Sequence, residues 1–176
     1  MTTTLAPVRW LALALLAVLL AGCGGSSKTA VTTTTAAATT TTTATTPKPG
    51  PGTVLYENGG WAVVVRGGTA RAFHLTAGRW APDTSGLVRI SILGPRGSAA
   101  ATPQVAAELA AKTPLVESTL WVDGTELQVK GGGLTPTRGT IYGAPSSPLR
   151  AGTHVAVAYA RTASHATAVA WTFRVG

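Results

Sequence analysis

The stretch that decides the fold is HVAVAYARTASHATAVAWTFRV, residues 154–175. Apolar side chains recur with a period of two on both sides of a short polar break at 162–165, which predicts two antiparallel strands joined by a tight turn. We expect the core face of this pair to hold Val155, Val157, Tyr159, Val169, Trp171, Phe173 and Val175. The opposite face is then nearly all alanine (Ala156, Ala158, Ala160, Ala166, Ala168 and Ala170), and an upstream segment or a partner protein could cover it.

Strand patterns continue upstream of this pair. Residues 87–93 alternate between apolar and polar side chains, and Pro103 and Pro114 leave so little room around 104–112 that we expect a strand there rather than a helix. Asp123-Gly124 predicts a hairpin between 118–122 and 125–130. Glycine-rich turns separate three short runs at 54–56, 61–66 and 70–75, which predicts a meander that either extends one sheet or forms a small subdomain.

Three segments of the C-terminal half resemble bacterial immunoglobulin-like domains. Residues 147–157 (SPLRAGTHVAV) with 170–175 (AWTFRV) resemble the last strands of that family, 120–124 (LWVDG) its middle hairpin and 90–95 (ISILGP) its opening strand. The resemblance implies an all-β chain, with an immunoglobulin-like β-sandwich at 87–176 after a β-meander at 53–86. It leaves the function open, because adhesion, spacing, carbohydrate-binding and docking domains share this fold.

The N-terminus has the layout of a secretory signal peptide over residues 1–22. Arg9 supplies a positive start, and the apolar helical run that follows it, 10–21, is shorter than the roughly 20 residues of a membrane-spanning helix. Leu20-Ala21-Gly22-Cys23 resembles the lipobox of bacterial lipoproteins. The resemblance implies cleavage before Cys23, a diacylglyceryl thioether and an acylated amine on that residue, and a lipid anchor on the extracytoplasmic side of the cell membrane. An ordinary signal peptide followed by a chance cysteine is the alternative.

A low-complexity linker follows the cysteine, so that 23–52 reads as a lipidated Cys23 and a Thr/Ala/Pro tether. With no aromatic residue and almost no large apolar one, this segment cannot bury enough surface to order itself, and we expect disorder. Its threonines and prolines suit a glycosylated spacer, while a run of no selected length is the other interpretation.

The residue inventory argues against catalysis, metals and cofactors. Cys23 is the single cysteine, so the exported part has no disulfide and no thiolate nucleophile. His74, His154 and His165 have no Asp, Glu or Cys beside them at metal-ligand spacing, and His154 and His165 should lie at opposite ends of the terminal hairpin. The His and Cys motif of the L,D-transpeptidases is missing, although members of that family also join a lipobox to immunoglobulin-like domains.

The charge distribution and the tryptophans carry the remaining hints. The net charge is +8, and no acid follows Glu126, whereas the same segment holds Lys130, Arg138, Arg150, Arg161 and Arg174. These residues could contact anionic lipid headgroups or wall polymers, or could simply solubilise the surface; nucleic acid is not an expected partner of an exported protein. Trp61 and Trp80 could stack on sugar rings or belong to the core.

We therefore expect a membrane-anchored, non-catalytic binding or docking module of the cell envelope, with a protein or an anionic wall polymer as its ligand. The alternative is an accessory or remnant subunit of a peptidoglycan-remodelling enzyme such as an L,D-transpeptidase.

Overall fold

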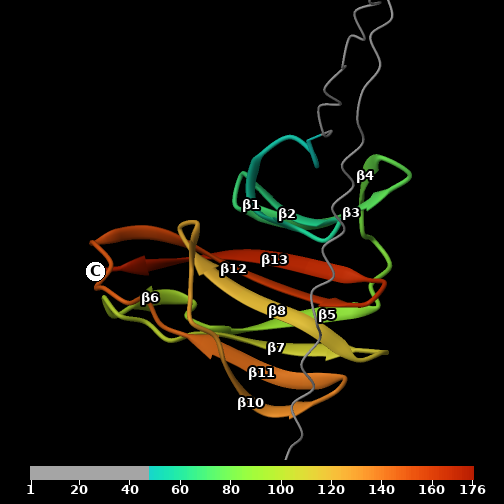
Figure 1. Cartoon of the computed structure of the whole chain (residues 1–176). Helices are drawn as coiled ribbons and strands as arrows, with labels where there is room; N and C mark the ends of the chain where they lie inside the picture. Colours follow the sequence, from blue (N-terminus) through green and yellow to red (C-terminus); the bar gives the residue numbers. More distant parts are fainter. Residues whose placement is uncertain (1–47) are drawn as a thin grey trace, which may run out of the picture. The chain divides into compact units, whose positions relative to one another are not determined.

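The computed structural model describes residues 48–176, so the predicted leader (1–22), Cys23 and the linker up to residue 47 lie outside the described residues. The described part consists of thirteen β-strands joined by turns and loops, which confirms the all-β prediction (Figure 1). Within 48–176 no helix is long and apolar enough to span a membrane.

Nine strands form a sandwich of two sheets. The four-stranded sandwich sheet has the order β10 (Lys130–Thr135), β11 (Arg138–Gly143), β7 (Val105–Ala111), β5 (Val88–Gly94). The five-stranded sheet has the order β6 (Gly97–Ala99), β13 (Ala166–Val175), β12 (Gly152–Thr162), β8 (Leu115–Val122), β9 (Thr125–Glu126). Read in chain order, the two sheets have the ABED and GFC strand arrangements of the immunoglobulin fold, which confirms an immunoglobulin-like sandwich.

The sandwich core lies between these two sheets. Its largest members come from both, with Leu109 and Ile141 on one side and Leu120 and Phe173 on the other. Trp171 lies in the same core, and its indole Nε1 donates a hydrogen bond of 2.9 Å to the Pro95 carbonyl. The strand predicted over 104–112 is confirmed as β7. The hairpin at Asp123-Gly124 is confirmed by the pairing of β8 with β9 and by positive φ angles of 49° and 83°, but its second strand spans only Thr125–Glu126 and not the predicted 125–130.

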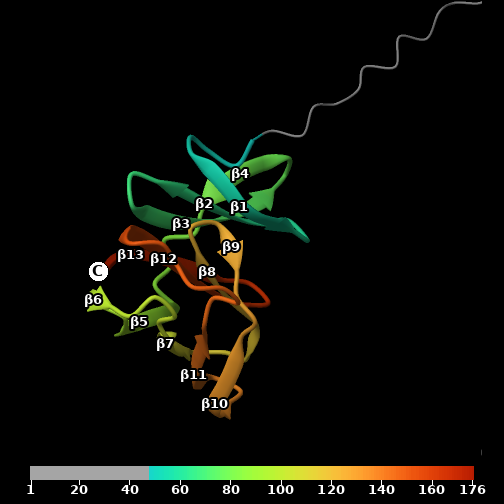
Figure 2. The ribbon, with the colours of Figure 1, turned by 90° about the vertical axis from the view of Figure 1, so that its left-hand side faces the viewer.

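The front meander forms a sheet of its own. Its strands β1 (Thr53–Asn58), β2 (Trp61–Arg66), β3 (Thr69–Thr76) and β4 (Arg79–Pro82) pair in sequence order, as an antiparallel up-and-down sheet. This meander packs on the outer face of the five-stranded sheet, opposite β12 and β13 (Figure 2). A second core fills the contact, where Trp61 and Val63 meet Trp121, Val157 and Tyr159.

The register of the terminal hairpin corrects the faces expected from the sequence. Ala156 pairs with Trp171 and Ala158 pairs with Val169, so these alanines face the sandwich core together with the large residues of β13. Val157 pairs with Ala170 and faces the meander instead. The prediction placed all the large residues on one face, and it was wrong by a shift of one residue, which turns every side chain of a strand to the other side.

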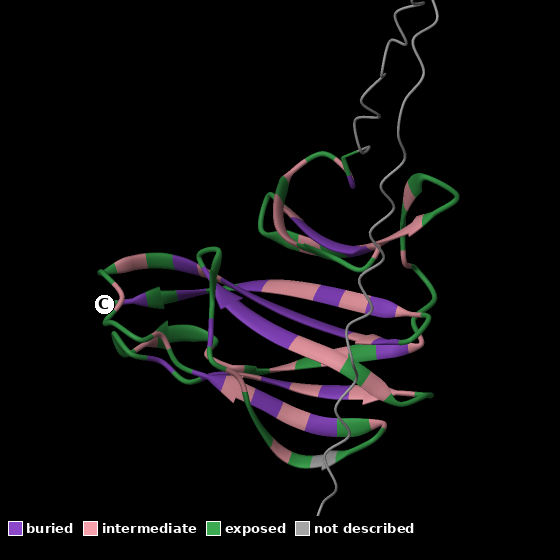
Figure 3. Ribbon diagram, viewed as in Figure 1, coloured by how far each residue is buried: buried purple, intermediate pink, exposed green. Residues whose placement is uncertain are grey.

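No open alanine face results from this register. Ala156, Ala158 and Ala160 lie inside the sandwich, whereas Ala166 and Ala168 lie under the meander. Both faces of β12 are therefore largely buried, as the burial colouring shows (Figure 3). The upstream segment covers the outer face of this hairpin.

Candidate functional site

Three basic side chains line one hollow at an end of the four-stranded sandwich sheet. Arg89 of β5 and Arg138 of β11 both pair with Ala110 of β7, which lies between them. Residues that pair directly across antiparallel strands point to the same face of the sheet, and the flanking Val88 and Leu109 point into the core. Both arginines and Ala110 therefore lie on the outer face.

A hollow with a volume of about 710 Å³ opens at this point, and we call it the basic hollow. Its lining consists of Gly86, Leu87, Arg89, Ala110, Ala111, Lys112, Thr135, Thr137 and Arg138. None of these lining residues is acidic, whereas three carry a positive charge. The meander does not cover this surface, because it packs on the other sheet.

Glu108 is the acid that forms an ion pair with a residue of the basic hollow, Arg138. Its Oε1 lies 3.9 Å from Arg138 Nε, and the two side chains are 44% and 71% exposed. An ion pair this long and this exposed contributes about 0–1 kcal/mol. The terminal nitrogens of Arg138 thus stay available to a ligand from solution.

Backbone hydrogen bonds hold the walls of the basic hollow in place. The amide of Ala111 donates to the Thr137 carbonyl at 2.8 Å, and the amide of Lys112 donates to the Leu87 carbonyl at 3.3 Å. The Thr135 hydroxyl accepts from the Arg138 amide at 3.0 Å, which closes the turn that presents Arg138. The cations are therefore attached to ordered strand ends rather than to a long loop.

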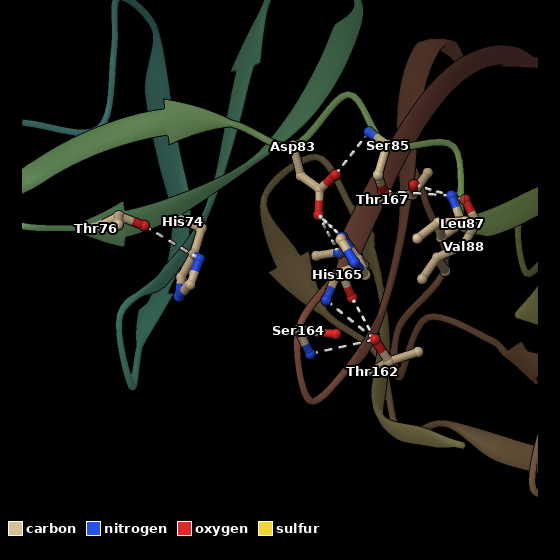
Figure 4. Close-up of polar contacts among 11 residues, drawn as sticks. His74, Thr76, Asp83, Ser85, Leu87, Val88, Thr162, Ser164, His165 and Thr167 are labelled. Carbon is tan, nitrogen blue, oxygen red and sulfur yellow. Dashed lines mark hydrogen bonds and ion pairs between the residues drawn. The ribbon is translucent and has the colours of Figure 1, made fainter. Parts of the chain in front are cut away.

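A cluster of hydrogen bonds around Asp83, which we call the polar pin, fixes the segment that leads from the meander into β5 and so positions Arg89. Asp83 accepts hydrogen bonds from the amides of Ser85 at 2.9 Å and Ala166 at 2.8 Å, and its Oδ2 lies 3.4 Å from His165 Nδ1 (Figure 4). Next to Ala166 on β13, the Thr167 hydroxyl donates a hydrogen bond of 2.8 Å to the Val88 carbonyl. The pin joins the meander, the β12–β13 turn and the start of β5.

The environment of Asp83 favours its charged form. Burial by itself would raise the pKa of this carboxyl, but the hydrogen bonds from Ser85 and Ala166 and the neighbouring His165 outweigh burial and hold the pKa below its ordinary value. The Asp83 side chain is therefore an ionised carboxylate over most of the pH range.

The five basic residues expected to contact an anionic surface do not form one patch. Arg138 and Lys130 share the outer face of the four-stranded sandwich sheet, because Tyr142, four residues after Arg138, pairs with Lys130. Arg174 pairs with Thr153 on the other sheet, and Arg150 lies in the loop before β12. Sequence reasoning missed Arg89 and Lys112: the outward position of Arg89 in its alternating strand was visible, but its neighbours were not.

Arg161 has a structural partner. Its Nε donates to Glu117 Oε2 at 2.5 Å, both side chains are 23% exposed, and the Tyr56 hydroxyl donates to the other oxygen of Glu117. The Arg161 guanidinium also lies 6.0 Å from the centre of the Trp61 ring. Arg161 thus joins the meander to the five-stranded sheet and is not a free cation for a surface.

The two tryptophans considered for sugar stacking differ in position. Trp61 is 3% exposed and stacks on His74 with ring centres 4.0 Å apart, so its ring belongs to the second core and does not face solvent. Trp80 is half-buried on β4, and its buried indole nitrogen has no hydrogen-bond partner among the described residues. The stacking role remains a prediction for Trp80.

His154 is buried and pairs with an acid from a distant part of the sequence. Its Nδ1 lies 2.6 Å from Asp123 Oδ2, and its Nε2 lies 2.8 Å from the Arg150 carbonyl oxygen. Both partners are acceptors, so both ring nitrogens must donate. The hydrogen bonds to Asp123 and Arg150 outweigh burial and raise the pKa of His154.

The histidines do not gather into a metal site. His154 lies near the start of β12 and His165 lies in the turn after it, as expected. Within 48–176, no group of three or more His, Cys, Asp or Glu side chains could hold a metal ion.

No protein-family model matches the chain, and no curated protein matches it. Among solved structures it is similar to the titin M4 domain, at 18% identity and a TM-score of 0.34 over 51% of this chain and 95% of that one. It is also similar to the complex of titin M10 with the obscurin-like 1 Ig domain, at 18% identity and a TM-score of 0.33 over 51% and 95% of the two chains. A tandem pair of titin Ig domains aligns at 7% identity and a TM-score of 0.35 over 69% of this chain and 75% of that chain.

Proposed function

We propose that this protein is a non-catalytic docking module of the bacterial cell envelope, held at the membrane by lipid on Cys23 and raised from it by the linker. Immunoglobulin-like sandwiches serve widely as binding and docking domains, which agrees with this role. The lipobox-like Leu20-Ala21-Gly22-Cys23 supports the anchor, and the Thr/Ala/Pro composition of 24–52 supports a spacer.

One observation carries the docking role more than any other. The meander covers the outer face of the five-stranded sheet, whereas the outer face of the four-stranded sandwich sheet stays open and presents Arg89, Lys112 and Arg138 around one hollow. An uncovered, positively charged sheet face favours contact with an anionic partner.

Two measurements test the proposal in the organism's own membranes. Mass spectrometry of the native protein should find Cys23 as the first residue, with lipid on its sulfur and its amine. The native protein should also stay bound to isolated envelope material after its lipid anchor is solubilised in detergent. An unmodified thiol or an attached leader would refute the anchor, and complete release from the envelope would refute the docking role.

A further inference from the structure

We infer that the basic hollow binds an extended anionic polymer, whose phosphate or carboxylate groups contact Arg89, Arg138 and Lys112 while the chain lies across the open sheet face. This inference deepens the proposed docking function by naming the ligand class and the residues that recognise it.

The pairing of the strands sets the distance between the two arginines. Arg89 and Arg138 are separated by one strand, and adjacent strands are about 4.8 Å apart, so their Cα atoms are about 10 Å apart. Ala110 between them has only a methyl side chain, which leaves space for both guanidinium groups to approach one oxyanion. Arginine suits this task because its planar fork donates two parallel hydrogen bonds to a phosphate or a carboxylate.

A fourth cation, Lys130, on the same sheet face argues for a long ligand. Lys130 pairs with Tyr142, which lies four residues beyond Arg138 on β11, or about 13 Å along the strand. The outward positions between them are Thr140 on β11 and Gly132 paired to it on β10. The Tyr142 ring lies beside Gly132, and Glu108 pairs with Thr140 on its other side. A chain with several negative groups could reach from the basic hollow past the Tyr142 ring to Lys130, whereas a single small anion could not span this distance.

The lining argues for a polymer rather than for a lipid surface. Membrane-surface sites combine cations with large apolar side chains that enter the lipid. Of the two large apolar side chains that are strongly exposed within 48–176, Val116 lies on the other sheet and Leu93 lies four residues after Arg89, towards the far end of β5, so neither lines the basic hollow. Leu87, which does line it, is half-buried. Polar Thr135 and Thr137 occupy the rim instead.

Glu108 offers a variant that should gain binding. Its carboxylate lies beside Arg138 and competes with an incoming anion. Glu108→Gln keeps the shape of the side chain and removes that charge, so we expect severalfold tighter binding of an anionic polymer. A loss of binding in this variant would contradict the assigned role of Arg138.

The test uses the full-length protein in a non-ionic detergent, with fluorescently labelled polyphosphate and polyglutamate chains as probes. We expect at least one of the two polymers to bind, and the double variant Arg89→Ser/Arg138→Ser to weaken its binding by about a hundredfold, since each charged hydrogen-bonding side chain accounts for about tenfold. The matched control Arg150→Ser/Arg174→Ser removes the same charge from exposed positions outside the basic hollow. It should stay within a few-fold of the wild type.

Several outcomes would overturn the inference. These are an equal loss in the two double variants, no binding of either polymer, full competition by equimolar inorganic phosphate, or arginine-dependent binding to phosphatidylglycerol vesicles without binding to either polymer. Circular dichroism and unfolding curves identify any variant that fails to fold, and Glu108→Gln then still tests the site. Retention on isolated envelope that does not depend on Arg89 and Arg138 would leave the proposed docking function intact and refute only this inference.

Discussion

Replacing Asp83 by alanine should loosen the junction between the meander and the sandwich. The Asp83 side chain is 8% exposed and receives hydrogen bonds from two backbone amides, those of Ser85 and Ala166. These amides belong to segments far apart in the sequence, so one carboxylate ties together parts of the fold that no single hairpin connects.

The magnitude follows from what each amide can do after the carboxylate is removed. Ser85 is exposed and its amide can bind water, so its loss is small. Ala166 is 1% exposed, and a buried amide without a partner costs about 1–3 kcal/mol. We therefore expect Asp83→Ala to lower the free energy of unfolding by about 2 kcal/mol, and Asp83→Asn, which keeps one acceptor oxygen, by about half as much.

Urea unfolding, followed by tryptophan fluorescence, measures this loss of stability as a lower urea midpoint with an unchanged m-value. Glu57→Ala is the matched control, because Glu57 is an exposed acid of the same meander and its removal should change stability by less than about 0.5 kcal/mol. Equal effects of the two variants would refute the role of Asp83 as a pin.

The same variant carries a pH signature. The pKa of Asp83 is lower in the folded protein than its ordinary value, so its contribution is present at neutral pH and is lost as the pH falls through that lowered value. Wild type and Asp83→Ala should therefore differ by a constant amount above about pH 4 and converge as the pH falls below that value. Parallel curves over the whole acid range would contradict this account.

Three further predictions concern side chains between or behind the sheets. The pKa of His154 is raised in the folded protein, so its pair with Asp123 stabilises the fold below about pH 6.5, and this contribution is lost as the pH rises through the folded-state pKa. The difference in unfolding free energy between wild type and His154→Gln should therefore shrink in alkaline buffer. A difference that stays constant with pH would contradict this prediction. The buried Tyr159 hydroxyl has no hydrogen-bond partner among the described residues, so Tyr159→Phe should be neutral or raise the free energy of unfolding by about 1 kcal/mol, and a clear loss in calorimetry would reveal a partner for it. Arg161→Met should lower the free energy of unfolding and leave polymer binding unchanged, because Arg161 is paired with Glu117. Weaker polymer binding at unchanged stability would show instead that Arg161 contacts the ligand.

The sequence predicted most strands because alternation and turn residues are local signals. Asn58-Gly59-Gly60 and Asp123-Gly124 mark hairpins by the positive φ angles they allow, and the structure has those hairpins. The glycine-rich strand β10, with Gly131, Gly132 and Gly133, carries no such alternation and was not predicted.

The register could not be predicted in the same way. Both faces of β12 are buried against something, so apolar residues at odd and even positions alike could have faced the sandwich core. The turn after Thr162 decides the pairing of Arg161 with Ala166, and one residue more or less would have exchanged the two faces.

The candidate site was only partly visible for the same reason. Arg138 was named from the charge of the C-terminal half, but its neighbours Arg89 and Lys112 come from β5 and from the end of β7. Arg161 looked equivalent to Arg138 in the sequence, and only the fold brings Glu117 to it.

Thiol labelling tests most directly whether this protein is lipid-anchored and docks through its open sheet face. Ser91→Cys adds a thiol on that face, where Ser91 pairs with Glu108, and Thr172→Cys adds one at an exposed position of β13 in the other sheet. In isolated membranes treated with a soluble maleimide, the wild type should not react, because the sulfur of Cys23 carries lipid. Added anionic polymer should protect Ser91→Cys and leave Thr172→Cys reactive. Labelling of Cys23 in the wild type, or equal labelling of both variants with and without polymer, would contradict the account.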